Sequence, residues 1–309
     1  MKNTFYLGLA AALACAACGG DVKETNGTVA AATSGAGGSA AATTSGAGGS
    51  ALPQPTLPAV TGACPEFVEG SVTFSPAGIG SRTVQIWMGP EAANQAGPLI
   101  FYWHGAGSSA VTEPPYGIGD AQLAAIKAMG GIVAAPVADP AAGQFSWHLA
   151  AGTKENDLML ADEVVACAVE KAGIDPRRIH SMGMSAGGLN TTQMSYRRSN
   201  YIASVVPYSG GKMGNPTMQN EANKFAAMIF HGGPSDQVII NFKDASETYR
   251  DDLLGRGHFA FICDHGNGHK IPTDARANVW QFFIDHPFGT DPSPYQAGLP
   301  QGFPSYCAP

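Results

Sequence analysis

The distribution of apolar residues changes character along the chain, and from residue 64 onward it predicts a folded domain. Short apolar runs alternate there with segments whose apolar residues recur every three or four positions. The runs predict strands and the segments predict helices, with Asp157 as the N-cap of one helix. Strands are predicted at 72–74, 82–88, 98–103, 131–137, 178–182, 204–208, 226–230 and 259–262, and helices at 119–129, 157–172, 189–196, 242–254 and 274–284. This alternation favours an α/β fold, in which a mostly parallel sheet carries helices on both faces.

The N-terminus shows the pattern of an export signal. Lys2 precedes an apolar run over residues 4–17, which ends in small residues before Cys18 and two glycines. This resembles a bacterial lipoprotein signal, in which the cysteine is lipidated and becomes the mature N-terminus. Cys15 is the poorer alternative for lipidation, and an ordinary cleaved signal peptide is the other interpretation. We therefore expect a secreted protein, or a lipoprotein of the outer membrane or cell surface.

Residues 19–62 are dominated by Ala, Gly, Ser and Thr, and the sequence Ser-Gly-Ala-Gly-Gly-Ser at 34–39 recurs at 45–50. Such a segment cannot bury enough apolar area to offset its conformational entropy, so it is predicted to be a flexible linker. The predicted organisation is a signal peptide over 1–18, a linker over 19–62 and one large domain over 63–309.

The overall charge limits the possible partners. The chain of 309 residues has 17 Lys and Arg against 24 Asp and Glu, a net charge of −7. An acidic balance argues against nucleic acid, whose phosphates attract basic surfaces. After the N-terminus, no apolar run approaches the roughly 20 residues that span a membrane. We expect a monomer that contacts a membrane only through an N-terminal lipid anchor.

Four cysteines lie in the predicted domain: Cys64, Cys167, Cys263 and Cys307. An even number in an exported protein suggests two disulfides, with three possible pairings. We favour Cys64–Cys167 and Cys263–Cys307, because each pair fastens one terminus to the core. Buried free thiols are the alternative, and the sequence alone leaves the pairing open.

Residues 183–187 read Gly-Met-Ser-Ala-Gly, which is the spacing of a nucleophile at a sharp strand-to-helix turn. Glycines two places to either side remove side chains that would clash in such a turn. The match follows the predicted strand 178–182 and precedes the predicted helix 189–196, which is the context that the turn needs. Ser185 is therefore the candidate nucleophile.

A serine hydroxyl needs a base, and the base needs a carboxylate to hold its tautomer. In this type of sheet the acid and then the histidine follow the serine along the chain. Asp236 lies in a polar turn after the strand 226–230, and His269 lies in the loop after the strand 259–262. We predict Asp236 as the orienting acid and His269 as the general base, with His265 as the competing histidine.

The negatively charged oxygen of a tetrahedral intermediate needs N–H donors. One is expected from Ala186, which follows the nucleophile. The other is expected from the loop after the strand 98–103, where residues 104–107 read His-Gly-Ala-Gly. We predict the N–H of Ala106, with that of Gly105 as the alternative, while the side chain of His104 either contacts substrate or is structural.

Four motifs occur together in one order: residues 104–107, the Gly-Met-Ser-Ala-Gly-Gly of 183–188, the His-Gly-Gly-Pro-Ser-Asp-Gln-Val of 231–238, and the Gly-Asn-Gly-His-Lys-Ile-Pro of 266–272. Together they resemble the polyhydroxybutyrate depolymerase and feruloyl esterase group of the α/β-hydrolase superfamily, over residues 100–285. The resemblance implies hydrolysis of a polyester, or of feruloyl or acetyl esters of plant polysaccharide, without cofactor or metal. The acid turn before Asp236 is one residue longer than the commoner form.

Two segments are expected to shape the substrate site. Only residues 209–225 separate two strands where lipases of this fold carry a lid, so we predict an open site that can accept a polymer. The long loop 138–156 carries Phe145 and Trp147; Trp147 is a candidate wall of the site, with packing as its alternative role. Two other functions stay open: a serine peptidase of the same fold, and a binding module on an inactive hydrolase fold.

Overall fold

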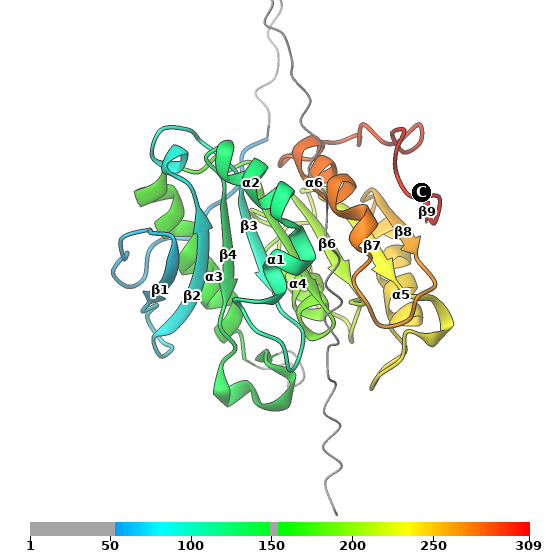
Figure 1. Cartoon of the computed structure of the whole chain (residues 1–309), viewed down its shortest axis with the longest axis horizontal. Helices are drawn as coiled ribbons and strands as arrows, with labels where there is room; N and C mark the ends of the chain where they lie inside the picture. Colours follow the sequence, from blue (N-terminus) through cyan, green and yellow to red (C-terminus); the bar gives the residue numbers. More distant parts are fainter. Residues whose placement is uncertain (1–52, 149–153) are drawn as a thin grey trace, which may run out of the picture. The chain divides into compact units, whose positions relative to one another are not determined.

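A computed structural model describes residues 53–148 and 154–309 of the chain (Figure 1). The predicted signal peptide, Cys18 and most of the predicted linker lie outside these residues. Within them, no helix is both long and apolar enough to cross a membrane.

The domain is built on a nine-stranded sheet with the order β1-β2-β4-β3-β5-β6-β7-β8-β9. From β4 to β8 the neighbouring strands run parallel, while β1, β2 and β9 pair antiparallel at the two edges. The strands are β1 Gly70–Phe74, β2 Arg82–Met88, β3 Leu99–Trp103, β4 Ile132–Pro136, β5 Ile179–Met184, β6 Ser204–Tyr208, β7 Ala226–His231, β8 Ala260–Asp264 and β9 Cys307–Ala308. All eight predicted strands are present, and only the two-residue β9 was not predicted.

Strand β3 shows why the central strands read as continuous apolar runs. All five of its residues are buried, because helices cover both faces of the sheet. Leu99, Phe101 and Trp103 point into one core, and Ile100 and Tyr102 point into the other. A strand with one face in water would instead have alternated apolar and polar residues.

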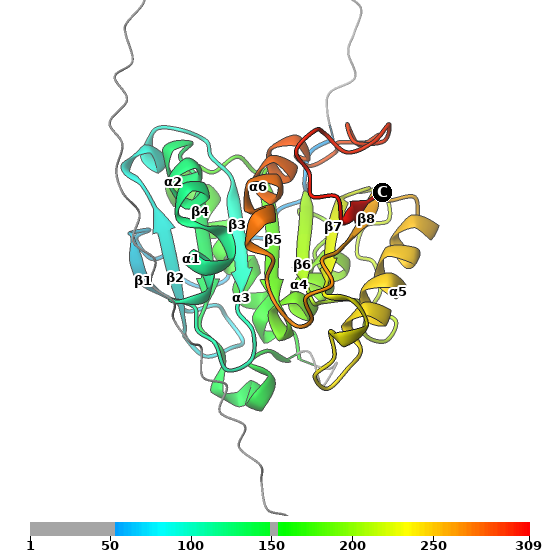
Figure 2. The same ribbon diagram turned by 45° about the vertical axis from the view of Figure 1, so that its right-hand side comes forward.

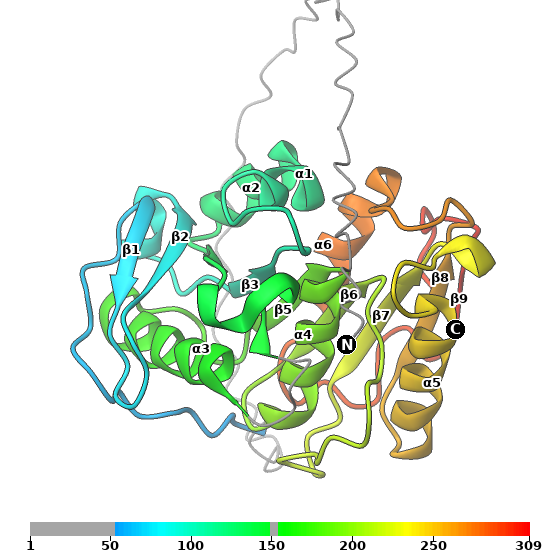
Figure 3. The same cartoon turned by 90° about the horizontal axis from the view of Figure 1, so that it is seen from below.

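Helices cover both faces of the sheet (Figures 2 and 3). Helices α1, α2 and α6 contribute to the core on one face, and α3, α4 and α5 contribute to the core on the other. The helices are α1 Glu113–Ile118, α2 Asp120–Ala128, α3 Asn156–Cys167, α4 Ala186–Arg197, α5 Phe242–Gly255 and α6 Arg276–Asp285. A π-helical turn, Ala168–Ala172, continues α3 and accounts for the longer helix predicted there.

Two local predictions were wrong. Helix α1 was not predicted; its two prolines lie in the first turn of the helix, where a missing N–H costs nothing. Asp157 does not cap α3, which begins at Asn156. Instead its buried carboxylate accepts hydrogen bonds from the Arg82 guanidinium at 3.2 Å and from the backbone N–H of His148 at 2.7 Å. Asp157 therefore fastens the loop before α3.

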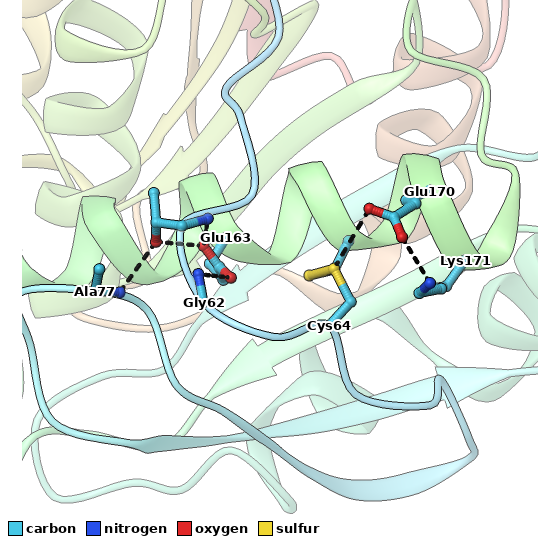
Figure 4. The surroundings of a disulfide bond; sticks show 8 residues. Gly62, Cys64, Ala77, Glu163, Glu170 and Lys171 are labelled. Carbon is cyan, nitrogen blue, oxygen red and sulfur yellow. Dashed lines mark hydrogen bonds and ion pairs between the residues drawn. A yellow bond between two sulfur atoms is a disulfide. The ribbon is translucent and has the colours of Figure 1, made fainter.

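The last residues of the predicted linker already contact the domain (Figure 4). Leu57 and Val60 are half-buried against the core. The backbone N–H groups of Thr61 and Gly62 each donate to the carboxylate of Glu163 at 2.8 Å. Those bonds hold the pKa of Glu163 below its ordinary value, although burial acts in the opposite direction. The packed part of the chain thus begins before residue 63.

Both disulfides form as favoured from the sequence. Cys64 bonds to Cys167 beside this contact (Figure 4), and Cys263 bonds to Cys307. The first joins the entry of the domain to the end of α3. The second joins the C-terminal tail to β8 through the antiparallel pairing of β8 with β9. Two disulfides indicate a protein of an oxidising compartment.

Removing the Cys64–Cys167 disulfide should destabilise the domain without altering its active site. The bonded residues are 103 positions apart. In the chain-entropy account, closing a loop of that length contributes roughly 4–5 kcal/mol. For a domain of this size, the double variant Cys64→Ala/Cys167→Ala should therefore melt about 10 °C or more below the wild type. Calorimetry gives the Tm, and ester hydrolysis at 20 °C is the control. An unchanged Tm would show that the bridge contributes nothing to stability.

Candidate active site

Ser185 lies at the turn between β5 and α4, as the sequence predicted. Its backbone has φ 58° and ψ −119°, a region that residues with a side chain rarely occupy. Such a conformation costs of the order of 1–3 kcal/mol and persists only where the surroundings impose it. Here the Ser185 N–H donates to the carbonyl of Tyr208 on β6 at 2.9 Å. The turn leaves the Ser185 side chain half-exposed at the carboxyl end of the sheet.

The flanking glycines are required by close backbone contacts. A Cβ on Gly183 would lie 2.4 Å from the carbonyl oxygen of Trp103, and one on Gly187 would lie 1.8 Å from the same atom. Gly188 is equally close to β6, because a Cβ added to it would lie 2.5 Å from the carbonyl oxygen of Tyr208. A larger residue at Gly187 or Gly188 would push α4 away from β3 or β6, and one at Gly183 would push β5 away from β3 and α4; each would displace Ser185.

The structure brings the three predicted residues into one hydrogen-bonded chain. The Nε2 of His269 lies 2.9 Å from the Oγ of Ser185, and its Nδ1 lies 2.7 Å from the Oδ1 of Asp236. Asp236 follows β7 and His269 follows β8, so parallel strands deliver both loops to the edge of the sheet where Ser185 lies. With a proton on Nδ1, the Nε2 of His269 is free to accept the hydroxyl proton of Ser185.

Asp236 is completely buried, and hydrogen bonds compensate its charge. Its Oδ2 accepts from the Ser209 hydroxyl at 2.8 Å and from the Gly232 N–H at 2.9 Å, while Oδ1 faces His269. Burial acts to raise the pKa of Asp236, but these donors together hold it below its ordinary value. The carboxylate is therefore ionised at neutral pH and orients the imidazole.

Two contacts hold His269 in place. The ring of Phe242, the first residue of α5, stacks on its imidazole with centroids 4.7 Å apart. The loop that carries His269 packs directly on the acid turn, since the Gly268 N–H donates to the Gly232 carbonyl at 2.9 Å. A Cβ on Gly232 would lie 1.9 Å from the carbonyl oxygen of Gly268. The longer acid turn is thus accommodated by a short 3-10 turn, Gly233–Ser235, that ends at Asp236.

His265, the competing histidine, lies away from this chain of hydrogen bonds. Its side chain is buried, its Nδ1 accepts from the Asn267 N–H at 3.3 Å, and its ring packs near Tyr306. Burial lowers the pKa of His265, so it is neutral at physiological pH. These contacts agree with a structural role.

The expected oxyanion donors lie beside Ser185. Ala186 is the first residue of α4, so its N–H has no intrahelical acceptor. Ala106 lines the same pocket as Ser185 and Ala186. The alternative donor, Gly105, is not available: its N–H donates to both carboxylate oxygens of Glu113 at 3.0 and 3.1 Å. Ala106 and Ala186 are therefore the remaining pair.

Glu113 is a residue of the site that was not predicted from the sequence. It opens α1, and besides Gly105 it accepts a hydrogen bond from the Tyr102 hydroxyl at 3.3 Å. Burial raises the pKa of Glu113 above its ordinary value, and hydrogen bonds from Ser108, Gly105 and Tyr102 offset only part of that shift. Glu113 thus holds the loop that carries Ala106 and is a candidate positioning residue.

Removing the carboxylate of Glu113 should loosen this loop. We expect Glu113→Ala to lower kcat roughly tenfold, about 1.4 kcal/mol of barrier, with a smaller change in KM. Glu113→Gln should restore most of the activity, because its amide oxygen can still accept from the Gly105 N–H. Steady-state kinetics on p-nitrophenyl butyrate test both variants. Equal activity of Glu113→Ala and wild type would exclude the positioning role.

The pH dependence of stability follows from the raised pKa of Glu113. A carboxyl whose pKa is raised by folding stabilises the protein fully below its unfolded-state pKa, near the ordinary value of 4.5. That contribution is lost as the pH rises through the folded-state pKa. Since Glu113→Gln cannot ionise, its Tm relative to wild type should increase from pH 4 to pH 8. A difference that stays constant over this range would contradict the shift.

An apolar pocket of about 340 Å³ opens at Ser185. Its wall is formed by α4 through Leu189, by Phe242, by the segment after Asp236 and by the loop before α3. The residues that line it are Ala106, Gln144, Phe145, Ser185, Ala186, Leu189, Gln193, Met213, Val238, Ile239, Ile240 and Phe242. Met213, from the segment 209–225, forms part of the rim instead of a lid.

Two predicted substrate contacts are corrected by the structure. Trp147 is fully buried: its ring meets Trp103 edge-on at 5.0 Å, and its Nε1 donates to the His104 carbonyl at 2.9 Å. His104 is also buried, and its Nδ1 lies 2.8 Å from the carbonyl oxygen of Gly105. Both side chains therefore contact the backbone of the loop 104–107 from the protein interior. From the same long loop it is Phe145 that faces the pocket.

Ser209 and Phe242 were also not foreseen. Ser209 directly follows β6, so a polar residue at the carboxyl end of a parallel strand was a usable signal. Phe242 begins the predicted helix 242–254, and no motif of the sequence marks it as part of the site. Glu113 gave no signal, because its role depends on a turn of the chain that the sequence pattern does not specify.

Comparisons with known proteins agree with this architecture. No protein-family model and no curated protein matches the chain. The native structure of pOPH superposes with a TM-score of 0.63 at 18% identity, covering 80% of this chain and 96% of that one. A thermostable esterase superposes with a TM-score of 0.58 at 16% identity, covering 70% and 62%. A ferulic acid esterase superposes with a TM-score of 0.50 at 13% identity, covering 68% and 94%.

The sheet order and these superpositions define the class: the chain has the α/β-hydrolase fold. The fold predicted from the sequence is confirmed. Esterases are among the structural neighbours, but identities below 20% establish the shared fold and not a shared substrate. The narrower resemblance to polyhydroxybutyrate depolymerases and feruloyl esterases stays a prediction.

Proposed function

We propose that this chain is an exported serine esterase that hydrolyses carboxylic esters through an acyl-enzyme. The observation that supports this most strongly is the hydrogen-bonded chain from Ser185 through His269 to a fully buried Asp236, at 2.9 and 2.7 Å, at the mouth of an apolar pocket. A buried ionised carboxylate behind an imidazole is costly to maintain, and activation of a hydroxyl accounts for it.

In the proposed reaction, His269 takes the hydroxyl proton of Ser185 as the oxygen attacks the ester carbonyl. The negative charge on the carbonyl oxygen is stabilised by the N–H groups of Ala106 and Ala186. The protonated His269, held by Asp236, then donates its proton to the leaving alcohol. Water attacks the acyl-enzyme with His269 again as base, which releases the acid and restores Ser185.

The pocket supports a substrate with an apolar portion of several carbons. Its volume of about 340 Å³ exceeds the need of an acetyl group, and its walls are aliphatic and aromatic. Met213, Val238 and Ile239 are exposed at its rim, the last two by 62% and 69%. Exposed apolar residues beside a site favour an extended or polymeric ester, so we propose a polyhydroxyalkanoate-type polyester or a feruloyl-type ester of plant polysaccharide over an acetyl ester.

The N-terminal sequence and the disulfides support a location outside the cytoplasm. We propose that Cys18 is lipidated and that the segment before the domain tethers a monomeric enzyme to a membrane surface. Metabolic labelling with a palmitate analogue, compared between the wild type and Cys18→Ala, tests the anchor. A labelled Cys18→Ala variant would place the lipid elsewhere.

A substrate panel tests the proposed function against its two alternatives. We expect turnover of p-nitrophenyl butyrate, with methyl ferulate and polyhydroxybutyrate deciding between the two substrate classes. A fluorophosphonate probe should label Ser185, which an inactive binding module would not allow. Faster cleavage of peptide amides than of matched esters would support the peptidase instead.

A further inference from the structure

A second, polar pocket of about 210 Å³ adjoins the apolar one. Gln193 and Met213 line both pockets, so a molecule that fills one reaches the other. Asn190, Gln193 and Arg197 lie on one face of α4, at intervals of three and four residues. Gln193 is eight residues beyond Ser185, so the boundary of the two pockets lies roughly 12 Å along the helix from the nucleophile.

The polar pocket contains a buried amide without a partner. The Asn190 side chain is 1% exposed, and its Nδ2 has no hydrogen-bond acceptor in the part of the chain that the structure describes. Neither Gln193 nor Asn215, which also line this pocket, makes a side-chain hydrogen bond with another described residue. Leaving a buried donor unpaired is costly, and native proteins rarely retain one without a reason.

Other polar groups of the pocket are already satisfied. Arg197 pairs with Glu155 at 3.0 Å, and Asp157 pairs with Arg82 at 3.2 Å. The Nε2 of His148 lies 2.9 Å from Asp139. Among the described residues, the lining groups without a partner are therefore carboxamides and the ammonium of Lys154.

The chemistry of this lining selects an uncharged ligand with several hydroxyls. A carboxamide offers donors and an acceptor together, and a hydroxyl does the same, so the two can pair in both directions. The lining carries two cations, Lys154 and Arg197, and two carboxylates, Glu155 and Asp157, so its formal charges balance and favour a neutral ligand over a charged one. Leu158, Met213 and Pro216 add apolar surface against which the C–H face of a ring can pack.

We propose that the polar pocket is a second substrate subsite, which binds a neutral, hydroxyl-rich group such as a sugar unit, with Asn190 and Gln193 as its specificity-determining residues. The apolar portion of the same ester then occupies the pocket at Ser185. This proposal rests on the proposed esterase function for its role in turnover, but binding to the subsite does not depend on catalysis.

Binding is tested first, by saturation-transfer NMR of the wild type with methyl β-glucopyranoside. We expect transfer to the ring protons of the glycoside, loss of that transfer in Asn190→Ala, and full transfer in Asn278→Ala. Asn278 is the matched control, because it lies on α6 and its amide donates to the Gly302 carbonyl. Absence of transfer in the wild type, or equal transfer in Asn190→Ala, would overturn the proposal. Stronger transfer to methyl glucuronide than to the neutral glycoside would overturn the choice of an uncharged ligand.

Kinetics then test whether the subsite serves the reaction. Methyl 6-O-butyryl-glucoside and ethyl butyrate share an acyl group, and we expect the wild type to favour the glycoside in kcat/KM by roughly tenfold. That preference should disappear in Asn190→Ala, mainly through KM for the glycoside, and should persist in Asn278→Ala. A preference unchanged in Asn190→Ala would overturn the role of the subsite. Hydrolysis of neither ester by the wild type would instead refute the esterase proposal, and the NMR result would still decide the subsite.

Thermal unfolding separates this role from a structural one. Since Asn190→Ala removes an unpaired buried group, its Tm should equal or exceed that of the wild type. Gln193→Ala, at a half-buried position, repeats the NMR and kinetic tests at a second residue. A fall in Tm for Asn190→Ala, together with full glycoside binding by Gln193→Ala, would show that Asn190 is structural and overturn the proposal.

Discussion

Replacement of Ser185 by alanine should remove nearly all ester hydrolysis while the domain stays folded. The hydroxyl is the only group at this position that can attack the carbonyl, and losses of roughly 10⁴–10⁶ in kcat accompany removal of such nucleophiles. Alanine keeps the Cβ, so the backbone strain at φ 58° is unchanged and the Tm should move little. Single-turnover and steady-state kinetics on p-nitrophenyl butyrate give the loss.

Two controls accompany the Ser185→Ala measurement. Circular dichroism and calorimetry establish that the variant is folded, and a fluorophosphonate probe should label the wild type but not the variant. Retention of more than about a tenth of wild-type turnover, far from the losses expected for a nucleophile, would place the nucleophile at another residue.

The two histidines of the loop after β8 should differ widely in their effect. We expect His269→Ala to lower kcat/KM by roughly 10⁴ or more, because it removes the imidazole that lies 2.9 Å from the Ser185 hydroxyl. We expect His265→Ala to cost at most roughly tenfold, about 1.4 kcal/mol of barrier. The side chain of His265 accepts a hydrogen bond from the nearby Asn267 N–H and packs near Tyr306, so its loss should affect stability more than chemistry.

Both histidine variants are compared on p-nitrophenyl acetate, with the Tm of each measured in parallel. Each variant is the control for the other, since the two histidines lie four residues apart in one loop and both are replaced by alanine. An inactive His265→Ala with an active His269→Ala would reverse the assignment of the base.

Much of the fold could be read from the order of apolar residues. Runs such as 98–103 are apolar at every position because both faces of a central parallel strand are buried, and few other structures require this. The turn at Ser185 could also be predicted from the sequence. Its glycines at 183 and 187 are required by close contacts with the carbonyl of Trp103, so they appear as a motif. The order serine, acid, histidine then followed from where successive parallel strands end.

Packing between residues far apart in the sequence could not be predicted in this way. The pattern placed Trp147 and Phe145 on one loop but could not tell which faces the pocket, because both are large and apolar. Only the folded chain directs the indole of Trp147 toward Trp103 and the ring of Phe145 toward Ser185. The role of the Glu113 carboxylate could not be predicted either, because its partner, the N–H of Gly105, is eight residues away across a turn.

The sequence by itself therefore determined the features that depend on neighbours along the chain: the strands and the strained turn at Ser185. The tertiary structure decided the features that depend on which surfaces meet. These are the distances from Ser185 to His269 and from His269 to Asp236, the pairing of the cysteines, and the burial of the Asn190 amide without a partner among the described residues. The physical reason is that periodicity records which side of an element is buried, whereas hydrogen bonds and pockets arise between elements remote in sequence.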